Sequence, residues 1–504
     1  MPTVRYQRRA PEHSVLYGAV RDEWPAVRAL AHQANAEGGL PAFIEQAAAQ
    51  FLRCGILQYG FVRAVCDRCK QSIVVAFSCK QRGICNSCDG KRMTEVAAHW
   101  LDEVIAPVPI RQWVITFPFE VRYLLAWNAP LRSAVLGAFM RALQAHYKRQ
   151  AIADCGRDPR YGAISVAQRF DGAVRLNVHW HILAADGAWV KTPEGLTFLP
   201  APPLQQADVE AVFADALRRI ARQLVRLVPD RDDEPQDRLS QRQPALAALF
   251  RNAMLGNQTT GKDAGKPQHV EFGKIRLDIK PHGRNCAQAH GYSLHANTRV
   301  GELARGDLEK LLRYVCRPAI AAHRLEQLDA QTIRISLKNE WSGGVTAVHV
   351  SPRDLLIRAL AQVPLPRKPS IRYHGNLAPN AADRPLVVPD AAKVKAGCKR
   401  TKVKTCRDDE TVAQASTRMS WAECQKRALL WDVLDCPCGG RRTVIAAVQD
   451  RAEIERFLKH LRLWPDSEDI TAIRGPPELL DPPDDEASDA WDAFDDPQPL
   501  EWTA

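Results

Sequence analysis

The chain has 504 residues, which is enough for two to four domains and a large buried core. Hydrophobic residues make up 46% of it and charged residues 25%, values close to those of soluble globular proteins. No apolar run approaches the roughly 18 residues of a membrane span, which argues against an integral membrane protein, and the first residues lack the apolar core of a secretory signal peptide. We therefore expect the 14 cysteines in a reducing compartment, where clustered cysteines favour metal binding over disulfides.

The positive charge is unevenly distributed along the chain. The formal net charge is +11, yet the residues from Glu478 to the end include ten acidic residues and no Lys or Arg. The segment from Arg367 to Arg407 holds 11 basic and 2 acidic residues. The strongly basic part of the chain before this tail favours a polyanionic partner such as DNA or RNA, although the charge could also only keep the protein soluble. The acidic tail is rich in proline and is predicted to be disordered.

Hydrophobic periodicity and turn residues predict the elements in chain order. The N-terminal part contains Ala-rich helices at about 15–53, a cysteine cluster at 54–88, a helix at 89–105, a strand at 112–117 and a long helix at 130–152. The middle contains two strands around a turn at 161–184, a loop with a short helix at 229–270 and a strand-like run at 272–280. The remainder contains a helix at 307–317, strands with a helix at 333–361 and a small module at about 417–475.

Two CxxC pairs stand 15 residues apart: Cys66 with Cys69, and Cys85 with Cys88. Four thiolates at this spacing suit tetrahedral zinc, and a closed set of four leaves no open coordination position, so they predict a structural site. Cys54 and Cys79 are spare, and either could replace one of the four. Basic residues surround the cluster, so the module either contacts nucleic acid or only stabilises the fold with solvated charges around it.

Two histidines stand out in residues 174–182, where polar and apolar side chains alternate as in a β-strand. His179 and His181 share the polar face about 6–7 Å apart, close enough to reach one divalent cation. The preceding Asp171-Gly172 predicts a two-residue hairpin turn, which would place Gln168 opposite Arg175 on the histidine face. Two surface histidines on a solvated strand are the alternative.

A tyrosine lies near the end of the helix predicted at 307–317, which has Asp307 as its N-cap and Pro318 after its last turn. Tyr314 is at the edge of the buried stripe, with Lys310 and Arg317 beside it. This position also fits an ordinary boundary tyrosine. A tyrosine that attacks a DNA phosphate needs cationic help, because its unperturbed pKa is about 10 and the phosphodiester is an anion. A metal on the two histidines and the two neighbouring cations could supply it.

These segments resemble HUH-type rolling-circle transposases of the insertion-sequence ninety-one and common-region (ISCR) group, from about residue 40 to 475. The resemblance is carried by the zinc module with Cys66-xx-Cys69 and Cys85-xx-Cys88, the strand Asn177–Leu183 followed by Asp186-Gly187, the run Arg313–Pro318, and the stretches Arg372–Asn380 and Asp435–Gly440.

The resemblance implies an α+β fold in which a four-cysteine zinc-binding module precedes an HUH nuclease domain, built on a central antiparallel sheet of about five strands with flanking helices. It implies a transposase that nicks single-stranded DNA at element ends, with Tyr314 forming a 5′-phosphotyrosine intermediate. It also implies Mg²⁺ or Mn²⁺ on His179 and His181, and structural Zn²⁺ on the cysteines. We expect Arg175, Lys310 and Arg317 to contact DNA.

The expected partners are single-stranded DNA at element ends, target DNA and host replication machinery, with no membrane, in the bacterial cytoplasm near the nucleoid. Lys310 stands four residues before Tyr314, so the chain resembles the single-tyrosine branch of the group. Cys436-Pro-Cys438 is one residue short of a CxxC, which leaves open a second zinc site; the other cysteines that could contribute to it are Cys398, Cys406 and Cys424.

Two other functions remain open at this point. One is a related replication initiator or relaxase with the same chemistry, and the other is a non-enzymatic zinc protein that binds DNA. A nucleotide-hydrolysing enzyme lacks support, because no GxxxxGK[ST] loop is present. The expected regions are an N-terminal helical region at 1–53, a zinc-binding DNA-contact module at 54–105, the HUH/tyrosine catalytic domain at 106–365, a basic linker at 366–416, a small C-terminal module at 417–475 and an acidic tail at 476–504.

Overall fold

The structure is a computed structural model that describes residues 10–34, 38–155, 159–193, 195–228, 238–256, 270–272, 284–341, 344–388 and 434–464. The acidic tail expected at 476–504 and most of the basic linker lie outside the described residues. The loop expected at 229–270 is described only in part, and the strand expected at 272–280 only at its first residue.

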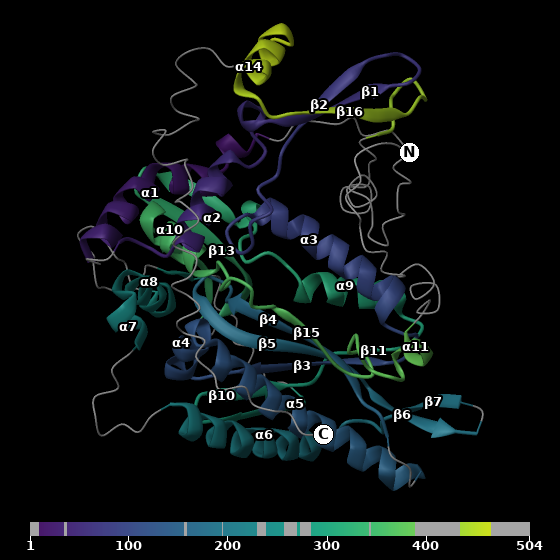
Figure 1. The fold of residues 1–504 in the computed structure, drawn as a ribbon. Coiled ribbons are helices and arrows are strands. Elements are labelled where there is room, and N and C mark those ends of the chain that lie inside the picture. Colours follow the sequence, from purple (N-terminus) through teal and green to yellow (C-terminus); the bar gives the residue numbers. More distant parts are fainter. Residues whose placement is uncertain are drawn as a thin grey trace, which may run out of the picture.

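A seven-stranded antiparallel sheet forms the middle of the molecule, where about five strands were expected (Figure 1). Its order is β15-β4-β5-β3-β10-β9, with β11 also paired to β3. The strands are β3 (Ile110–Thr116), β4 (Gly162–Phe170), β5 (Leu176–Ala185), β9 (Cys286–Ala289), β10 (Tyr292–His295), β11 (Arg299–Val300) and β15 (Ile371–Gly375).

Helices cover both faces of this sheet (Figure 1). One side carries α4 (Phe119–Trp127), α5 (Ala129–Cys155), α6 (Gln206–Leu227) and α8 (Pro244–Leu255), and α7 (Arg238–Arg242) packs against α8. The other side carries α3 (Asn86–His99), which continues into a π-helical turn (Trp100–Val104), and α9 (Arg305–Val315). Trp180 of β5 is buried in the core on the α5 side, whereas Leu183 packs with Leu312 of α9 on the other. Strand β5 is therefore buried on both faces.

The β4–β5 hairpin differs from the turn that was predicted. Five residues, 171–175, connect the strands, and the Asp171 carboxylate accepts hydrogen bonds from the backbone N–H groups of Ala173 and Arg175. The ladder consequently pairs Gln168 with His179, not with Arg175. The prediction was wrong because it treated Asp-Gly as a complete two-residue turn, whereas the aspartate side chain stabilises a longer loop.

Three further helices and a second sheet pack beside the central sheet. Helices α1 (Val15–Ala34), α2 (Ala42–Arg53) and α10 (Pro352–Ala361) contact one another and contribute to the same buried core as α4, α5 and α8. A boundary at residue 53 would therefore fall within a shared core. The second sheet has the order β12-β13-β14-β8. Its strands are β12 (Leu325–Asp329), β13 (Thr332–Trp341), β14 (Val345–Val350) and β8 (Val270–Phe272).

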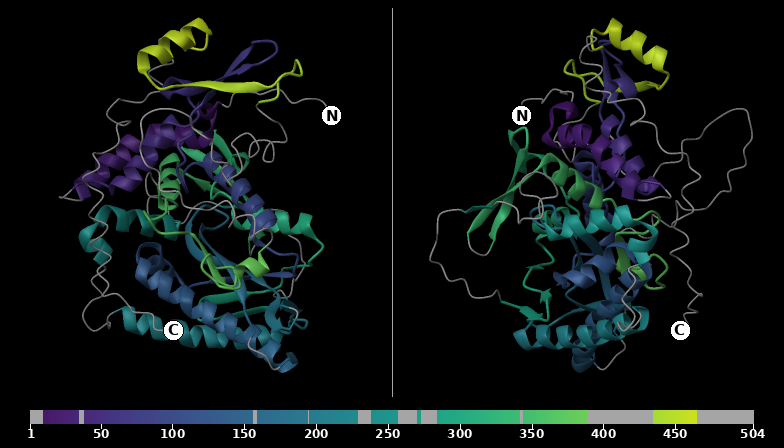
Figure 2. Two further views of the ribbon diagram at one scale, coloured as in Figure 1. Left: turned by 45° about the vertical axis from the view of Figure 1, so that its right-hand side comes forward. Right: turned by 90° about the vertical axis from the view of Figure 1, so that its left-hand side faces the viewer.

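A third sheet joins the N-terminal and C-terminal parts of the described chain (Figures 1 and 2). Strand β16 (Arg442–Val448) pairs with β1 (Phe61–Cys66), which pairs with β2 (Ser72–Ala76), and α14 (Arg451–His460) packs against them. The smaller elements are the β6–β7 hairpin (Gly187–Thr192 and Gly195–Pro200), α11 (Arg384–Val387) and four short helical turns, η1 (Pro11–His13), η2 (Leu57–Tyr59), η3, which is the π-helical turn above, and η4 (Ala322–Arg324). Among the described residues no helix is both long and apolar enough to cross a membrane.

A buried carboxylate fixes the end of the histidine strand. Asp186, directly after β5, accepts hydrogen bonds from the Arg111 guanidinium at 2.8 and 3.0 Å and from Arg299 at 2.7 Å. The Tyr147 hydroxyl of α5 donates to the same carboxylate at 3.1 Å. This network ties β3, β11 and α5 to the end of the strand that carries the two histidines.

Candidate active site and cysteine clusters

The two histidines of β5 face each other. Their Nε2 atoms are 3.1 Å apart, and both side chains are buried. Burial lowers the pKa of His179 to about 4, and burial together with the neighbouring imidazole holds the pKa of His181 well below its usual range. Both rings are therefore neutral at pH 7, and neutral imidazole is the form that binds metal ions. The polar face of β5 is covered by α9 and is not the solvated surface that alternation alone suggests.

Tyr314 lies beside the histidine pair. Its ring meets that of His181 edge-on, with centroids 5.9 Å apart. Helix α9 positions it, since Leu308, Leu311 and Val315 form a buried stripe and Tyr314 stands at the edge of that stripe, where it was predicted. The helix begins at Arg305, so Asp307 lies in its first turn and is not the N-cap.

A pocket of about 730 Å³ contains the histidine pair and the tyrosine. It is lined by residues of several strands and loops and of α9, including Gln112, Asn177, His179, His181, Lys310, Tyr314, Arg317 and Lys338. The Arg317 guanidinium carbon lies 4.5 Å from the centre of the Tyr314 ring, and the Lys338 ammonium lies 4.6 Å from it. Two cations therefore flank the phenol in a partly enclosed space, where charge interactions are stronger than in water.

The predicted DNA-contact residues occupy different environments. Arg317 lies at the pocket, and its Nε atom is buried without a hydrogen-bond partner among the described residues. Lys310 also lines the pocket, but its side chain is 82% exposed and its ammonium pairs with Asp307 at 2.9 Å. Arg175 pairs with Asp171 at 2.7 Å and stacks on a tryptophan, outside the pocket lining.

Lys338 and Gln112 are site residues that the sequence analysis missed. Lys338 reaches Tyr314 from β13 of the second sheet, and only the packing of that sheet brings it there. Gln112 faces His181 from β3, with its side-chain nitrogen 2.5 Å from His181 Nδ1. A polar residue within a buried strand was the one signal that could have pointed to Gln112.

Eight of the described cysteines form two compact groups of four. The helix cluster consists of Cys54, Cys79, Cys85 and Cys88, and the ribbon cluster consists of Cys66, Cys69, Cys436 and Cys438. In each cluster the four sulfur atoms lie within 4.8 Å of one another. The structure therefore does not bring the two CxxC pairs together, because each pair has other partners.

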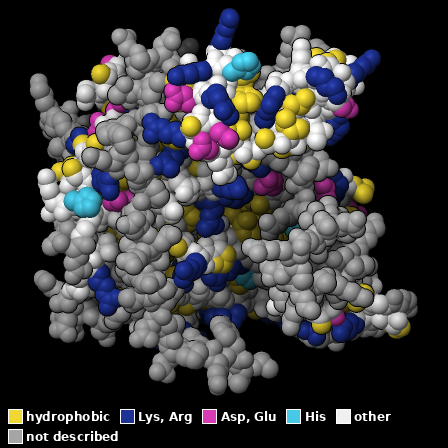
Figure 3. All heavy atoms as spheres, turned by 45° about the horizontal axis from the view of Figure 1, so that its top comes forward, with side chains coloured by type: hydrophobic (Ala, Val, Ile, Leu, Met, Phe, Trp, Pro, Cys, Tyr) yellow, Lys and Arg dark blue, Asp and Glu magenta, His cyan; other side chains and the backbone are white. Residues whose placement is uncertain are grey.

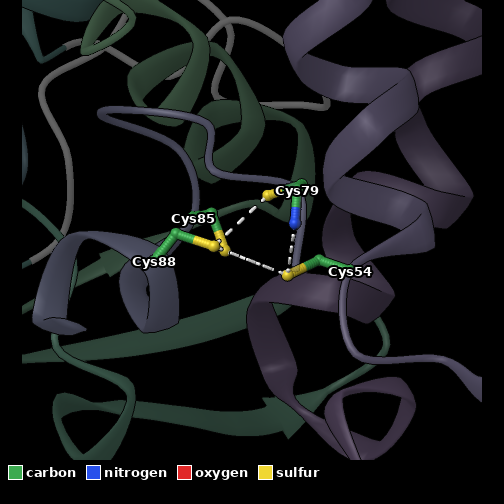
Figure 4. A group of neighbouring side chains, drawn as sticks. All are labelled: Cys54, Cys79, Cys85 and Cys88. Atoms are coloured by element: carbon green, nitrogen blue, oxygen red, sulfur yellow. Dashed lines mark hydrogen bonds between the residues drawn. The ribbon is translucent and has the colours of Figure 1, made fainter. Parts of the chain in front are cut away.

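The helix cluster lies between the end of α2 and the start of α3 (Figure 4). Cys54 Sγ is 3.7 Å from Cys88 Sγ and 3.6 Å from Cys85 Sγ, and Cys79 Sγ is 3.6 Å from Cys88 Sγ. Hydrogen bonds from the neighbouring thiols hold the pKa of Cys54 far below its usual value. A thiolate among three further thiols inside a buried core is the donor set of a structural zinc site.

Two family models match the chain, each over one of these regions. A model described as "Transposase zinc-binding domain" matches residues 26–117, and a model described as "Putative transposase" matches residues 162–384. The chain belongs to the transposases of the insertion-sequence ninety-one (IS91) family. No curated protein and no solved structure is significantly similar to it.

Each of the two family matches contains one of the sites described above. The zinc-binding span contains the whole helix cluster, which agrees with structural zinc in the N-terminal module. The transposase span contains both histidines and Tyr314. Cys436 and Cys438 of the ribbon cluster lie outside both spans.

The histidine pair of this transposase also fits one divalent cation. Two ligands at adjacent corners of an octahedral ion, each about 2.1 Å from it, stand about 3 Å apart, and the Nε2 atoms are 3.1 Å apart. Oxygen donors are close by. The side-chain oxygens of Asn177 and Gln168 are both buried without a hydrogen-bond partner among the described residues. Asn177 shares the histidine face of β5, and Gln168 stands opposite His179.

The hydrogen bonds of the rings decide which nitrogens are free for a metal. His179 Nδ1 donates to the backbone oxygen of Asn177 at 2.8 Å, which leaves a lone pair on its Nε2. The NH₂ group of Gln112 donates to His181 Nδ1, so His181 carries its proton on Nε2 and donates it to His179. If the Gln112 amide turns over, its oxygen accepts from Nδ1–H, and both Nε2 lone pairs then face the same point.

Proposed function

We propose that this transposase is a metal-dependent HUH tyrosine endonuclease and strand transferase, which nicks single-stranded DNA at element ends for rolling-circle transposition. The observation that carries the proposal is the shared pocket: two neutral, facing imidazoles and one tyrosine beside two cations. The zinc-binding and transposase matches support the broader assignment to DNA transposition.

In the proposed reaction the Tyr314 oxygen attacks a scissile phosphorus in line with the 3′ oxygen. The new bond joins tyrosine to the 5′ phosphate, the bond from phosphorus to the 3′ oxygen breaks, and the 3′ hydroxyl leaves with a proton. Arg317 and Lys338 are close enough to the phenol ring to bind the phosphate oxygens of the strand that it attacks. The reverse attack, by the 3′ hydroxyl of another strand, rejoins DNA and frees Tyr314.

We propose that His179 and His181, with an oxygen of Asn177 or Gln168, bind Mg²⁺ or Mn²⁺. The ion would supply Lewis-acid polarisation of the scissile phosphate. The neutral imidazoles and the two unpartnered buried amide oxygens support this donor set. Protons compete little for these nitrogens at neutral pH, because burial lowers their pKa values.

A single DNA strand is the substrate that we propose for this pocket. The phenol lies in a partly enclosed pocket, and a flexible single strand can bend into it more easily than a stiff duplex. Figure 3 shows Lys and Arg side chains spread over one face of the molecule, many of them around a hollow in the middle of the view. We propose that basic side chains around the pocket bind the flanking phosphates, and that Lys310 and Arg175 are among these outer contacts. We propose that the enzyme acts in the cytoplasm near the nucleoid, where host replication would copy the transferred strand.

A covalent-adduct assay tests this proposal. Labelled single strands that span each end of the element are mixed with the zinc-loaded enzyme and Mn²⁺, and the products are separated on a denaturing gel. We expect a shifted band that requires the metal and is absent in Tyr314→Phe, which removes only the nucleophilic oxygen. Tyr373→Phe is the matched control, because the Tyr373 hydroxyl accepts a hydrogen bond from Trp100 outside the pocket, and this variant should form the band normally. A band that persists in Tyr314→Phe contradicts the proposal.

A further inference from the structure

We propose that the ribbon cluster is a second structural zinc site, which joins the N-terminal and C-terminal parts of the chain. Cys66 and Cys69 lie at and just after the end of strand β1, and Cys436 and Cys438 precede strand β16. The Cys66 and Cys438 sulfurs are 3.5 Å apart, as are those of Cys69 and Cys436. Four sulfurs around one zinc at about 2.3 Å would stand about 3.8 Å from each other.

The distances favour a metal over disulfides. A disulfide requires sulfurs about 2.05 Å apart, whereas the two cross-strand sulfur pairs of this cluster are each 3.5 Å apart. The set of four also has no oxygen or nitrogen ligand and leaves no position for substrate, so it is typical of a closed structural site. Cys66 and Cys436 are buried, and the other two cysteines are half-buried.

The backbone around the sulfurs is shaped to hold them. The Gly439 N–H donates to the Cys436 carbonyl at 2.9 Å, and Gly439 adopts a φ of 78°, which favours glycine. A Cβ atom on Gly440 would lie 2.8 Å from Cys66 Sγ, so only glycine fits there. The Gly-Gly pair after Cys438 therefore makes room for the opposing cysteine. Cys436 and Cys438 need to supply only two of the four ligands, because Cys66 and Cys69 of strand β1 and the turn after it supply the other two. A CxC spacing can therefore suffice.

Hydrogen bonds outside the sulfur atoms also join the turn after β1 to the turn before β16. The Asp67 N–H donates to the Arg441 carbonyl at 2.9 Å, and the Arg441 N–H donates to the Asp67 carboxylate at 2.9 Å. Arg68 donates to the Cys438 carbonyl at 2.9 Å. The Arg442 guanidinium lies 3.7 Å from Cys436 Sγ, where its charge would stabilise a thiolate ligand.

The size of the local core gives the site a role. The sheet of β16, β1 and β2 with α14 has a separate core of only six buried apolar residues, drawn from both ends of the chain: Leu57, Phe61, Val74, Val448, Ile454 and Leu458. So small a core rarely holds a module together without a metal or a disulfide. Zinc at the ribbon cluster would add the stabilisation that this small core lacks and hold residues 434–464 against β1.

Zinc stoichiometry of the full-length protein tests the proposal. Mass-spectrometric metal analysis should find two zinc ions per chain in the wild type and one in Cys436→Ser/Cys438→Ser. Cys66→Ser should also hold one, and the combination Cys66→Ser/Cys436→Ser should still hold one, because both residues serve the same ion. Cys286→Ser is the matched control outside both clusters and should keep two ions.

Two outcomes would overturn the assignment. Retention of two ions in Cys436→Ser/Cys438→Ser would exclude the C-terminal cysteines as ligands. Loss of both ions in Cys66→Ser/Cys436→Ser, with one lost in each single variant, would show that the two residues serve different ions. Neither outcome depends on DNA cleavage, so this test is independent of the proposed function.

Alkylation of the wild-type protein avoids any variant that fails to fold. With zinc bound, Cys69 and Cys438 should react slowly with N-ethylmaleimide although both are only half-buried. Removal of zinc by a chelator should make all four ribbon cysteines reactive together, as peptide mass spectrometry can follow. Rapid reaction of Cys69 and Cys438 in the zinc-loaded protein would contradict the proposal. It would also be contradicted if a reductant made the ribbon cysteines reactive while both zinc ions stayed bound.

Discussion

Replacement of Gln112 tests how the proposed metal site is organised. In Gln112→Met a thioether replaces the amide that faces His181 Nδ1 at 2.5 Å, so no amide oxygen can turn towards Nδ1 and hold the proton there when a metal binds Nε2. Loss of such an outer hydrogen bond weakens metal binding by about 10-fold to 100-fold, or about 1.4 to 2.7 kcal/mol. Gln112→Glu should bind as tightly as the wild type or more tightly, because a carboxylate can only accept from Nδ1–H and fixes the required tautomer without turning over.

The assay is calorimetric titration of Mn²⁺ into the zinc-loaded full-length protein. Gln362→Met is the matched control, since that buried amide donates to the backbone oxygen of Val174 and lies outside the pocket lining. It should leave the Kd for Mn²⁺ unchanged. A wild-type Kd in Gln112→Met would refute the role of Gln112, and an equal loss in Gln112→Glu would refute the tautomer explanation.

Three further perturbations have expected outcomes. Asp186→Ala leaves the Arg111 guanidinium buried without its carboxylate, and should lower the free energy of unfolding by about 3–5 kcal/mol. Urea denaturation measures this loss, and a loss below about 1 kcal/mol would contradict a stabilising role for the Asp186 network. Burial lowers the pKa of His374 from 6.5 to about 4, so the unfolded chain binds a proton that the folded chain does not, and stability should fall as pH drops through this window. The loss reaches about 3 kcal/mol at pH 4, and denaturation curves of His374→Gln should show that much less acid sensitivity. Arg317→Ala should slow adduct formation by about 100-fold or more, but Lys310→Ala by less than about 10-fold because its ammonium is exposed and paired; equal effects in single-turnover assays would argue against this ranking.

Local signals predicted the elements that carry the site. Alternation predicted the strand with His179 and His181, and the apolar spacing of residues 308–315 predicted the helix that presents Tyr314. Both signals depend only on neighbouring residues, so they survive without knowledge of the tertiary fold. The first residue of a helix is harder to predict: α9 begins two residues before Asp307, so this aspartate lies in the first turn and is not the N-cap.

Long-range pairing could not be predicted from the same signals. The partners of Cys66 and Cys69 lie more than 360 residues away along the chain, and spacing within one segment cannot reveal them. The nearer CxxC pair offered a plausible but different set. Lys338 was missed for the same reason, because a lysine in an exposed-looking strand carries no mark of the tyrosine that it will contact.

The register of the hairpin shows how one turn can mislead. A two-residue turn at Asp171-Gly172 would separate Gln168 from the histidines, whereas the five-residue connection places it directly opposite His179. The observed register thus makes Gln168 a candidate ligand, since its side-chain oxygen is buried without a hydrogen-bond partner among the described residues. The carboxylate of Asp171 supplies the difference, because it can hydrogen-bond within a longer loop as well as start a tight turn.

Identification of the DNA-linked residue tests the central claim most directly. The adduct formed with a labelled single strand is digested with protease and nuclease, and the remaining nucleotide-linked peptide is sequenced by mass spectrometry. We predict one modified peptide, with the 5′ phosphate on Tyr314. A phosphate on another residue, or cleavage of the strand with no linked peptide, would contradict the claim that Tyr314 is the nucleophile of this transposase.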